Sequence, residues 1–321
     1  MRRKGCLGCS FPVIIIISVV IFVLVIIGLI SGPIGRSLFG DIGPKWLQVP
    51  TPEPELPVEP IFQISGFHVT NSMITAWISI ILIVLASYFA FRRMKLVPSG
   101  FQAIVEYIFG SLLDFCVSVA GEKNGRRFFP VVSTIFIFVI VNAWLGLLPF
   151  YGASITIFNG EAEVPLLRAA NTDVNVPLAI ALFAFVAVEF YGIKSLGFLN
   201  YAGKFIRIGQ VRHGFGLLFK GKVLSSFGSF FFGFIDIFVG ALEGLSEFIR
   251  IVSFTFRLFG NMLAGEILLL IAAFLIPLVI PVIFYGLEVL VGFIQALIFG
   301  GLTLVFLTLA VSGHGDEEQA K

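Results

Sequence analysis

Seven charged side chains lie in the otherwise apolar stretch 224–311, and their presence there needs a chemical explanation. A charge at the centre of a bilayer costs ~2.5–3.5 kcal/mol on insertion scales, a cost that leucine would avoid. Ionisable residues in such surroundings mark ion or proton pathways, or they pair with one another. The seven are Asp236, Glu243, Glu247, Arg250, Arg257, Glu266 and Glu288.

Arg257 differs from the other six because no acid lies near it along a helix. The nearest, Glu247 and Glu266, are ten and nine residues away. A guanidinium is always protonated, and it cannot remain unpaired in lipid. We therefore expect its counter-charge to come from elsewhere, either from Glu288 on the last helix or from another subunit.

Helical spacing places several polar residues on the face of Arg257. Glu243, Arg250 and Arg257 are seven residues apart, so successive members drift by only ~20° around a helix. Asn261 follows Arg257 by four residues and joins the same face. Glu247 precedes Arg250 by three residues and can form an ion pair with it. Glu243 is then either a residue of an aqueous path or a second partner for Arg250.

Two further carboxylates belong to other faces. Glu266 is nine residues beyond Arg257, which turns it by ~180° to the opposite side of the helix. Glu288 and Gln295 are seven residues apart and share a face of the last apolar segment. Asp236 is expected at the membrane interface.

The composition indicates that these helices lie in a membrane. Of 321 residues, 58% are apolar and 12% are charged, against ~25% charged in a soluble domain. The mean hydropathy is +1.04. These values exclude a disordered, collagenous or ordinary soluble protein, and a net charge of +2 gives no indication of nucleic-acid binding.

Long uncharged stretches predict about six membrane-embedded helices, because a bilayer core needs ~20 apolar residues. No ten-residue alternation typical of a β-barrel is present. The predicted fold is an all-α polytopic membrane protein. The uncharged stretches are residues 5–35, 69–91, 128–160, 174–188, 267–287 and 289–315.

Basic residues predict the orientation, because they are enriched in cytoplasmic loops. About sixteen of the 21 Lys and Arg fall on one side if both termini are cytoplasmic, and three fall on the other. We expect a multi-pass protein of the cell (inner) membrane. The first span is either a retained anchor, which its long apolar run favours, or a cleaved signal peptide. The inner group is Arg2, Arg3, Lys4, Arg92, Arg93, Lys95, Lys123, Arg126, Arg127, Lys194, Lys204, Arg207, Arg212, Lys220, Lys222 and Lys321; the outer group is Arg36, Lys45 and Arg168.

These features divide the chain into three parts. Residues 1–35 form a cytoplasmic tip with an additional anchor, in which Cys6 and Cys9 are expected to be reduced thiols near the inner leaflet. Residues 36–68 form a Pro-rich outer linker. The core, 69–321, has spans at ~71–91, ~129–149 and ~174–193 and a hairpin of ~224–276 and ~281–311. Within it, 96–127 predicts an amphipathic helix in the inner interface, and the basic stretch 194–222 contacts anionic lipid or a partner.

The sequence offers no cluster for covalent, hydrolytic or metal chemistry. It has three histidines and no H-E-x-x-H, G-x-S-x-G or Walker A motif. We expect no metal and no cofactor. Two rival classes are a secondary transporter, which would favour two homologous halves, and an intramembrane enzyme, which would need a nucleophile and a base.

The run SEFIRIVSFTFRLFGNMLAGE resembles the signature of subunit a of F-type ATP synthases. NTDVNVPLAIALF, which begins at Asn171, resembles the family's entry from an outer loop into a helix. The spacing of Glu288 and Gln295 resembles the pattern of its last helix. The resemblance covers roughly residues 65–313.

The resemblance implies a non-catalytic stator subunit that carries protons to and from carboxylates on a rotating c-ring. The hairpin would be strongly tilted, with one half-channel open to each side of the membrane. Arg257 would be the essential arginine between the half-channels. The implied outer path is Asn261, Glu266, Glu288 and Gln295; the inner path includes Glu243; secondary residues are Glu247, Arg250, Asp173 and Asn175.

The implied partners are c-ring subunits, b-type peripheral stalk subunits, the remaining ATP synthase subunits and membrane lipid. The chain departs from the family pattern at two points. The N-terminal span lies outside the common core, and carboxylates stand at both 266 and 288, where some members have histidine at the second position. The order of proton transfer between these carboxylates and the choice of H⁺ or Na⁺ stay open.

Overall fold

Helices account for most of the chain in the computed structural model. It describes residues 11–40, 60–64, 66–92, 95, 98, 100–148, 156–159, 162–165, 167–205 and 223–312. Several features singled out from the sequence lie outside these residues. They are Arg2, Arg3, Lys4, Cys6, Cys9, Lys45, the Pro-rich stretch 49–59, Arg93, the basic stretch 206–222 and Lys321.

The described part of the chain contains six helices that are long and apolar enough to cross a membrane. This confirms the predicted all-α polytopic fold. Helices suit such segments because each backbone amide and carbonyl in lipid must find a partner within the segment itself. The candidate spans are Pro12–Ser31, Asn71–Phe91, Phe101–Gly146, Asn175–Leu196, Phe231–Leu275 and Ile280–Val311.

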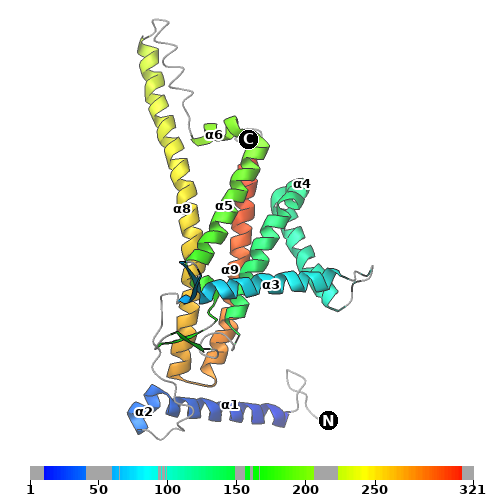
Figure 1. Cartoon of the computed structure of the whole chain (residues 1–321), viewed down its shortest axis with the longest axis vertical. Coiled ribbons are helices and arrows are strands. Elements are labelled where there is room, and N and C mark those ends of the chain that lie inside the picture. Colours follow the sequence, from blue (N-terminus) through cyan, green and yellow to red (C-terminus); the bar gives the residue numbers. More distant parts are fainter. Residues whose placement is uncertain are drawn as a thin grey trace. The chain divides into compact units, whose positions relative to one another are not determined.

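Six long helices contain these spans in the described part of the chain, and the short helices α2 and α6 follow α1 and α5 (Figure 1). All four helix ends of the C-terminal hairpin lie within one residue of the predicted positions. The helices are α1 (Phe11–Ser31), α2 (Pro33–Phe39), α3 (Asn71–Phe91), α4 (Phe101–Gly146), α5 (Asn175–Leu196), α6 (Phe198–Phe205), α8 (Val223–Leu275) and α9 (Ile280–Val311), and a 3-10 turn spans Ala170–Thr172.

Helix α4 combines two elements that the sequence predicted separately, the interfacial helix 96–127 and the span ~129–149. The combined element begins at Phe101 and ends at Gly146. Gly121 interrupts it with φ 77° and ψ 166°, a conformation that is essentially restricted to glycine. The direction of the chain therefore changes at this residue, before the apolar part of α4 begins.

In the part of the chain that the structure describes, two short β-hairpins occur between the helices, and the sequence analysis did not predict them. Strand β1 (Pro60–Ile64) pairs antiparallel with β2 (Phe67–Thr70), in the segment assigned to an extended linker. Strand β3 (Thr156–Asn159) pairs with β4 (Ala162–Pro165). The segments between the spans therefore contain local β-structure, although the spans are helical.

The chain forms two compact units, which are described separately. The first comprises residues 1–75, 142–172 and 260–294. In this unit α1 crosses the turn between α8 and α9 instead of running along the hairpin (Figure 1). The Cα atoms of Gly28 and Gly32 lie against the backbone carbonyls of Pro277 and Leu275, where a β-carbon would collide. Glycine at both positions permits this approach of two backbones.

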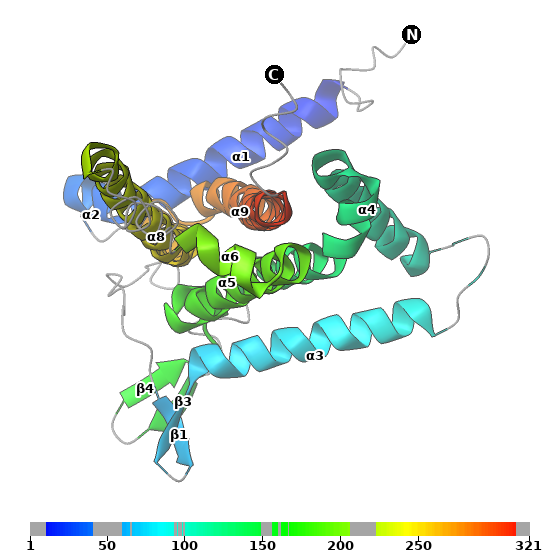
Figure 2. The same cartoon turned by 90° about the horizontal axis from the view of Figure 1, so that it is seen from above.

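The second unit comprises residues 76–141, 173–259 and 295–321. Helix α5 lies beside the parts of α8 and α9 that belong to this unit (Figure 2). A buried apolar cluster joins α4, α5 and α9, which fixes these three helices against one another. Its members are Cys116, Phe128, Val132, Val188, Leu304, Leu307 and Ala310.

Candidate functional site

Arg257 lies on α8 with its side chain exposed. Its Nη2 group donates a hydrogen bond to Oγ of Ser253, one turn earlier on α8, over 3.4 Å. The salt bridges described in the second unit are formed by Arg126 and Arg250, and Arg257 takes part in none of them. Among the described residues of its unit, Arg257 therefore has no salt bridge, and the source of its counter-charge stays a prediction.

Large apolar side chains cover the exposed face of α8 beside Arg257. Ile249 and Phe256 are 54% and 60% exposed, whereas Phe254 and Leu258 on the other side are buried. Ser253 is also exposed on this face. An extended apolar helix face that a chain leaves uncovered marks contact with lipid or with another protein. The guanidinium of Arg257 therefore lies at the edge of an exposed surface that suits contact with an apolar neighbour.

Arg250, by contrast, is fully engaged within the second unit. Its Nη1 lies 2.6 Å from Oε2 of Glu247, which confirms the predicted ion pair between neighbouring turns. The guanidinium also lies 3.7 Å from the ring centre of Phe306 on α9, within cation–π range. This residue therefore links α8 to α9 and is not available to an external anion.

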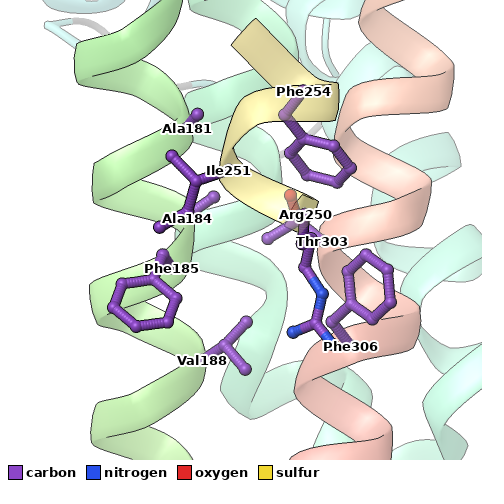
Figure 3. A pocket seen from close by; sticks show the side chains of 9 residues that line it. All are labelled: Ala181, Ala184, Phe185, Val188, Arg250, Ile251, Phe254, Thr303 and Phe306. Carbon is purple, nitrogen blue, oxygen red and sulfur yellow. The ribbon is translucent and has the colours of Figure 1, made fainter. Parts of the chain in front are cut away.

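A small cavity of about 10 Å³ lies beside Arg250, between α5, α8 and α9 (Figure 3). Its volume is enough for about one water molecule. Most of the wall is apolar, and the guanidinium points along it toward the ring of Phe306. The lining residues are Ala181, Ala184, Phe185, Val188, Arg250, Ile251, Phe254, Thr303 and Phe306.

Tyr201 of α6 occupies a buried position that sequence reasoning missed. Its ring lies against Gly192 of α5, and a β-carbon on residue 192 would lie 2.5 Å from Cε2 of the tyrosine ring. Burial, and secondarily the nearby carboxylate of Glu189, raise the pKa of the hydroxyl above its ordinary value. The contact holds the short amphipathic helix α6 against the end of α5.

The carboxyl group of Glu288 lies in the first unit, on α9, and its residue is 7% exposed. It packs against the bare Cα of Gly265 on α8, and a β-carbon on residue 265 would collide with Oε1, Oε2 and Cδ of the carboxyl. The glycine of the LAGE sequence therefore forms the surface that receives this carboxyl group. Sequence reasoning placed Glu288 in the site but gave Gly265 no role.

Glu266, the next residue of α8, has a cationic partner in the same unit. Its Oε1 lies 3.6 Å from Nε of Arg168, in the segment between β4 and α5. The side chain of Arg168 is 8% exposed and that of Glu266 is 36% exposed. The sequence analysis counted Arg168 only as one of three outer basic residues, because nothing in local spacing connects positions 168 and 266.

Asp173 and Asn175 form the beginning of α5 in the second unit. The backbone N–H and side-chain amide of Asn175 donate to Oδ1 of Asp173 over 3.0 and 2.9 Å. A carboxylate at this end also suits the positive end of the helix dipole. These two predicted site residues therefore have a clear local function in starting the helix.

The predicted residues are divided between the two units. Asn261, Glu266 and Glu288 belong to the first unit, together with Arg168 and Gly265. Among the residues described, no group of three His, Cys, Asp or Glu side chains could hold a metal ion. The second unit contains Asp173, Asn175, Glu243 (half-buried), Glu247, Arg250, Arg257 and Gln295 (buried).

Comparison with known proteins gives two findings. The family model described as ATP synthase A chain matches residues 73–308. A protein of Gloeobacter violaceus named "ATP synthase subunit a" is 31% identical over 246 residues, which cover 77% of this chain and 85% of that protein. The region that the family model matches begins after α1 and α2, and it includes α8 and all of α9 up to residue 308.

Proposed function

The chain belongs to the ATP synthase A chain family of the ATP synthase membrane sector, and we propose that it is a stator with two offset proton half-channels. Protons enter one half-channel, neutralise a carboxylate on a c-ring subunit, travel with the ring and leave through the other. Proton flow is thereby coupled to rotation and ATP synthesis. In this proposal the chain is non-catalytic, because the ATP chemistry belongs to other subunits.

The observation that carries this proposal is the position of Arg257. Its guanidinium cannot lose its proton, and it lies on an exposed, largely apolar helix face outside the salt bridges of its unit. A carboxylate ~4 Å away would gain ~4 kcal/mol at an effective dielectric constant of ~20. That energy changes a protonation equilibrium about a thousandfold. A ring carboxyl that reaches Arg257 would therefore release its proton.

The proposed path uses residues on both sides of Arg257. Its outer half includes Asn261, Glu266, Glu288 and Gln295, and its inner half includes Glu243. The fixed charge of the guanidinium repels protons, so direct passage between the half-channels is blocked. Lysine would be a poor substitute, because its ammonium group can lose its proton when it is desolvated.

The proposed partners are c-ring subunits, b-type peripheral stalk subunits and the remaining ATP synthase subunits, with lipid around the spans. The exposed apolar face of α8 fits a ring helix that slides past it. The proposed location is the cell (inner) membrane, with both termini cytoplasmic and the hairpin strongly tilted. The membrane potential then supplies ~2.3 kcal/mol per charge for each 100 mV.

The test is the variant Arg257→Ala in the assembled complex. We expect ATP-driven proton pumping into inverted membrane vesicles to be lost, while the chain still purifies with the c-ring. Arg126→Ala is the matched control, because this arginine is exposed and, among the described residues, forms a salt bridge with Glu122 one turn away. Normal pumping by the Arg257 variant would refute the proposal, and purification of the chain without a ring would instead favour a transporter.

A further inference from the structure

In the part of the chain that the structure describes, helix α1 is buried at one end only. Nearly all of its residues from Pro12 to Ile27 are exposed, whereas Gly28, Ser31 and the adjoining Gly32 are buried. Positions three and four residues apart lie on the same face of a helix, so these small residues form one short surface. The contact of α1 with its unit is therefore confined to the last turn of the helix.

This buried end lies against the turn between α8 and α9. The Cα of Gly28 faces the backbone carbonyl of Pro277, and the Cα of Gly32 faces that of Leu275. A β-carbon at either glycine would collide with the carbonyl oxygen, and one at residue 28 would lie 3.4 Å from Cγ2 of Ile276. Helix α1 thus contacts the main chain of the turn at two points, which residues with side chains would prevent.

The two carbonyl groups are chemically suited to such a contact. Leu275 ends α8, so its carbonyl has no donor within the helix. The carbonyl of Pro277 accepts a hydrogen bond from the N–H of Val279 over 3.3 Å, which is long. A carbonyl that faces lipid without a donor is strongly unfavourable. The Cα–H groups of glycine are weak donors to carbonyl oxygens where helices meet, so α1 supplies partners and also excludes lipid.

The turn has a backbone conformation that its surroundings must maintain. Leu278 has a φ of 81°, a value that residues with a β-carbon rarely adopt. Its own side chain is 38% exposed, so packing of that side chain does not explain the conformation. Such conformations persist where the neighbouring structure fixes them. The carbonyls on either side of this strained region, at 275 and 277, are the two that α1 contacts.

The chain after α1 folds back and completes this end of the helix. Nε of Arg36 on α2 donates a hydrogen bond to the carbonyl of Ser31 over 3.2 Å. Gly35 approaches the carbonyl of Leu29 so closely that a β-carbon there would collide with it. A span that served only as a removable signal would have no need of this structure.

We propose that α1 is a retained membrane helix whose last turn binds the turn between α8 and α9 through Gly28 and Gly32 and holds that turn in place. This role goes beyond the function proposed above, because the region that matches the family begins only at residue 73. It selects the retained anchor from the two alternatives that the sequence left open. The predicted orientation agrees with it, since the end of α1 and the turn at 276–279 both fall on the outer side.

The experiment cuts the chain between α2 and β1 and asks whether α1 stays bound. A protease site is placed within residues 49–59, and the whole complex is purified through a tag at the C-terminus of this chain. We expect mass spectrometry to find α1 in the uncut chain and, after cutting and washing in detergent, still bound to the tagged part. Gly28→Leu with Gly32→Leu should cause loss of the fragment. The matched control, Gly286→Leu on α9, should keep it, because no atom lies within 4 Å of an added β-carbon at 286.

Three results would overturn the proposal. They are a mature chain that already lacks α1, a wild-type fragment that washes away, and a double leucine variant that keeps its fragment, since α1 would then be held by other contacts. Arg257→Ala should keep the fragment as the wild type does while it loses pumping. Failure of this proposal is therefore distinguishable from failure of the proposed function.

Photo-cross-linking tests the same contact without altering either glycine. A diazirine-bearing residue replaces Ile276, whose Cγ2 lies beside Gly28. We expect irradiation of the complex in its membrane to link position 276 to the α1 peptide. The control position is Val282 on α9, which is 66% exposed and should give no such link. Absence of the link from 276, or an equal yield from 282, would contradict the proposal.

Discussion

Gly265 shows how a missing side chain can define a site. The carboxyl group of Glu288 occupies the space in which a β-carbon of residue 265 would stand. Any larger residue must therefore move the carboxyl or push the two helices apart. The position of Glu288 in the proposed path therefore depends on a glycine that has no reactive group of its own.

We predict that Gly265→Ala slows proton pumping about 10- to 100-fold, the range that follows when a reacting group is displaced by an ångström or so. The variant should still assemble with its partner subunits. Gly286→Ala is the matched control on α9, because no atom lies within 4 Å of the added methyl group there. Equal pumping rates for the two variants would show that the position of the Glu288 carboxyl does not limit transport.

Single residues differ in how well the sequence predicts them. Arg257 could be singled out because its isolation from acids is a property of local spacing. Arg168 could not, since its partner is about a hundred residues away and the positive-inside rule treats it as one outer charge among three. Gly265 could not be predicted either, because only the register between α8 and α9 shows that Glu288 faces it.

At the scale of elements, Gly121 determines the course of α4. Its φ of 77° and ψ of 166° lie in a region that residues with a β-carbon avoid, and the helix continues on both sides. The break separates the predicted interfacial part of α4 from its apolar part. A residue that cannot adopt this conformation would force one of the two parts to move.

We predict that Gly121→Ala destabilises the chain by ~1–3 kcal/mol, the usual cost of a strained backbone conformation. Thermal unfolding in detergent should show a lower midpoint. Gly110→Ala, earlier in α4, is the control: its surroundings are open, and alanine favours a helix over glycine by up to ~1 kcal/mol. A midpoint for Gly121→Ala at or above that of Gly110→Ala would contradict this account of the break.

The long apolar helices could be predicted from the sequence, because length and hydropathy alone specify them. The hairpin boundaries were correct to about a residue. The β-hairpins could not be predicted in the same way, since β1 to β4 have four or five residues each and lie in polar or Pro-rich segments. The division of α4 into two parts could also be predicted, but its position at Gly121 could not, because the charges between 114 and 127 mark no single boundary.

At the scale of the whole molecule, the six spans and the distribution of basic residues predict one orientation in the membrane. Both termini would be cytoplasmic, with α2 outside and the break in α4 inside. The N-terminal helix α1 is not part of the region that matches the family, yet it contacts the turn of the hairpin through Gly28 and Gly32. This contact gives the additional span a structural place within the first unit.

We predict opposite labelling of two single cysteines in a variant in which Cys6, Cys9 and Cys116 are replaced by serine. Ser37→Cys in α2 should react with an impermeant maleimide from the outer side, because Ser37 is exposed at the end of the first span. Lys123→Cys, exposed next to the break in α4, should react only from the cytoplasmic side. If both cysteines react from the same side, the number of spans between positions 37 and 123 must be even, and the predicted orientation is wrong.

The most direct test of the central claim is an oxidative cross-link between α8 and the c-ring. In the complex without other reactive cysteines, Ser253→Cys, one turn from Arg257, is paired with a cysteine one turn from the ring carboxylate. A disulfide forms only when the two β-carbons come within about 3.5–4.5 Å, so the cross-link reports close approach. We expect Ser253→Cys to cross-link and Thr255→Cys, on the buried face of α8, not to do so. An intact complex in which position 253 never cross-links, while position 255 does, would show that Arg257 does not face the ring.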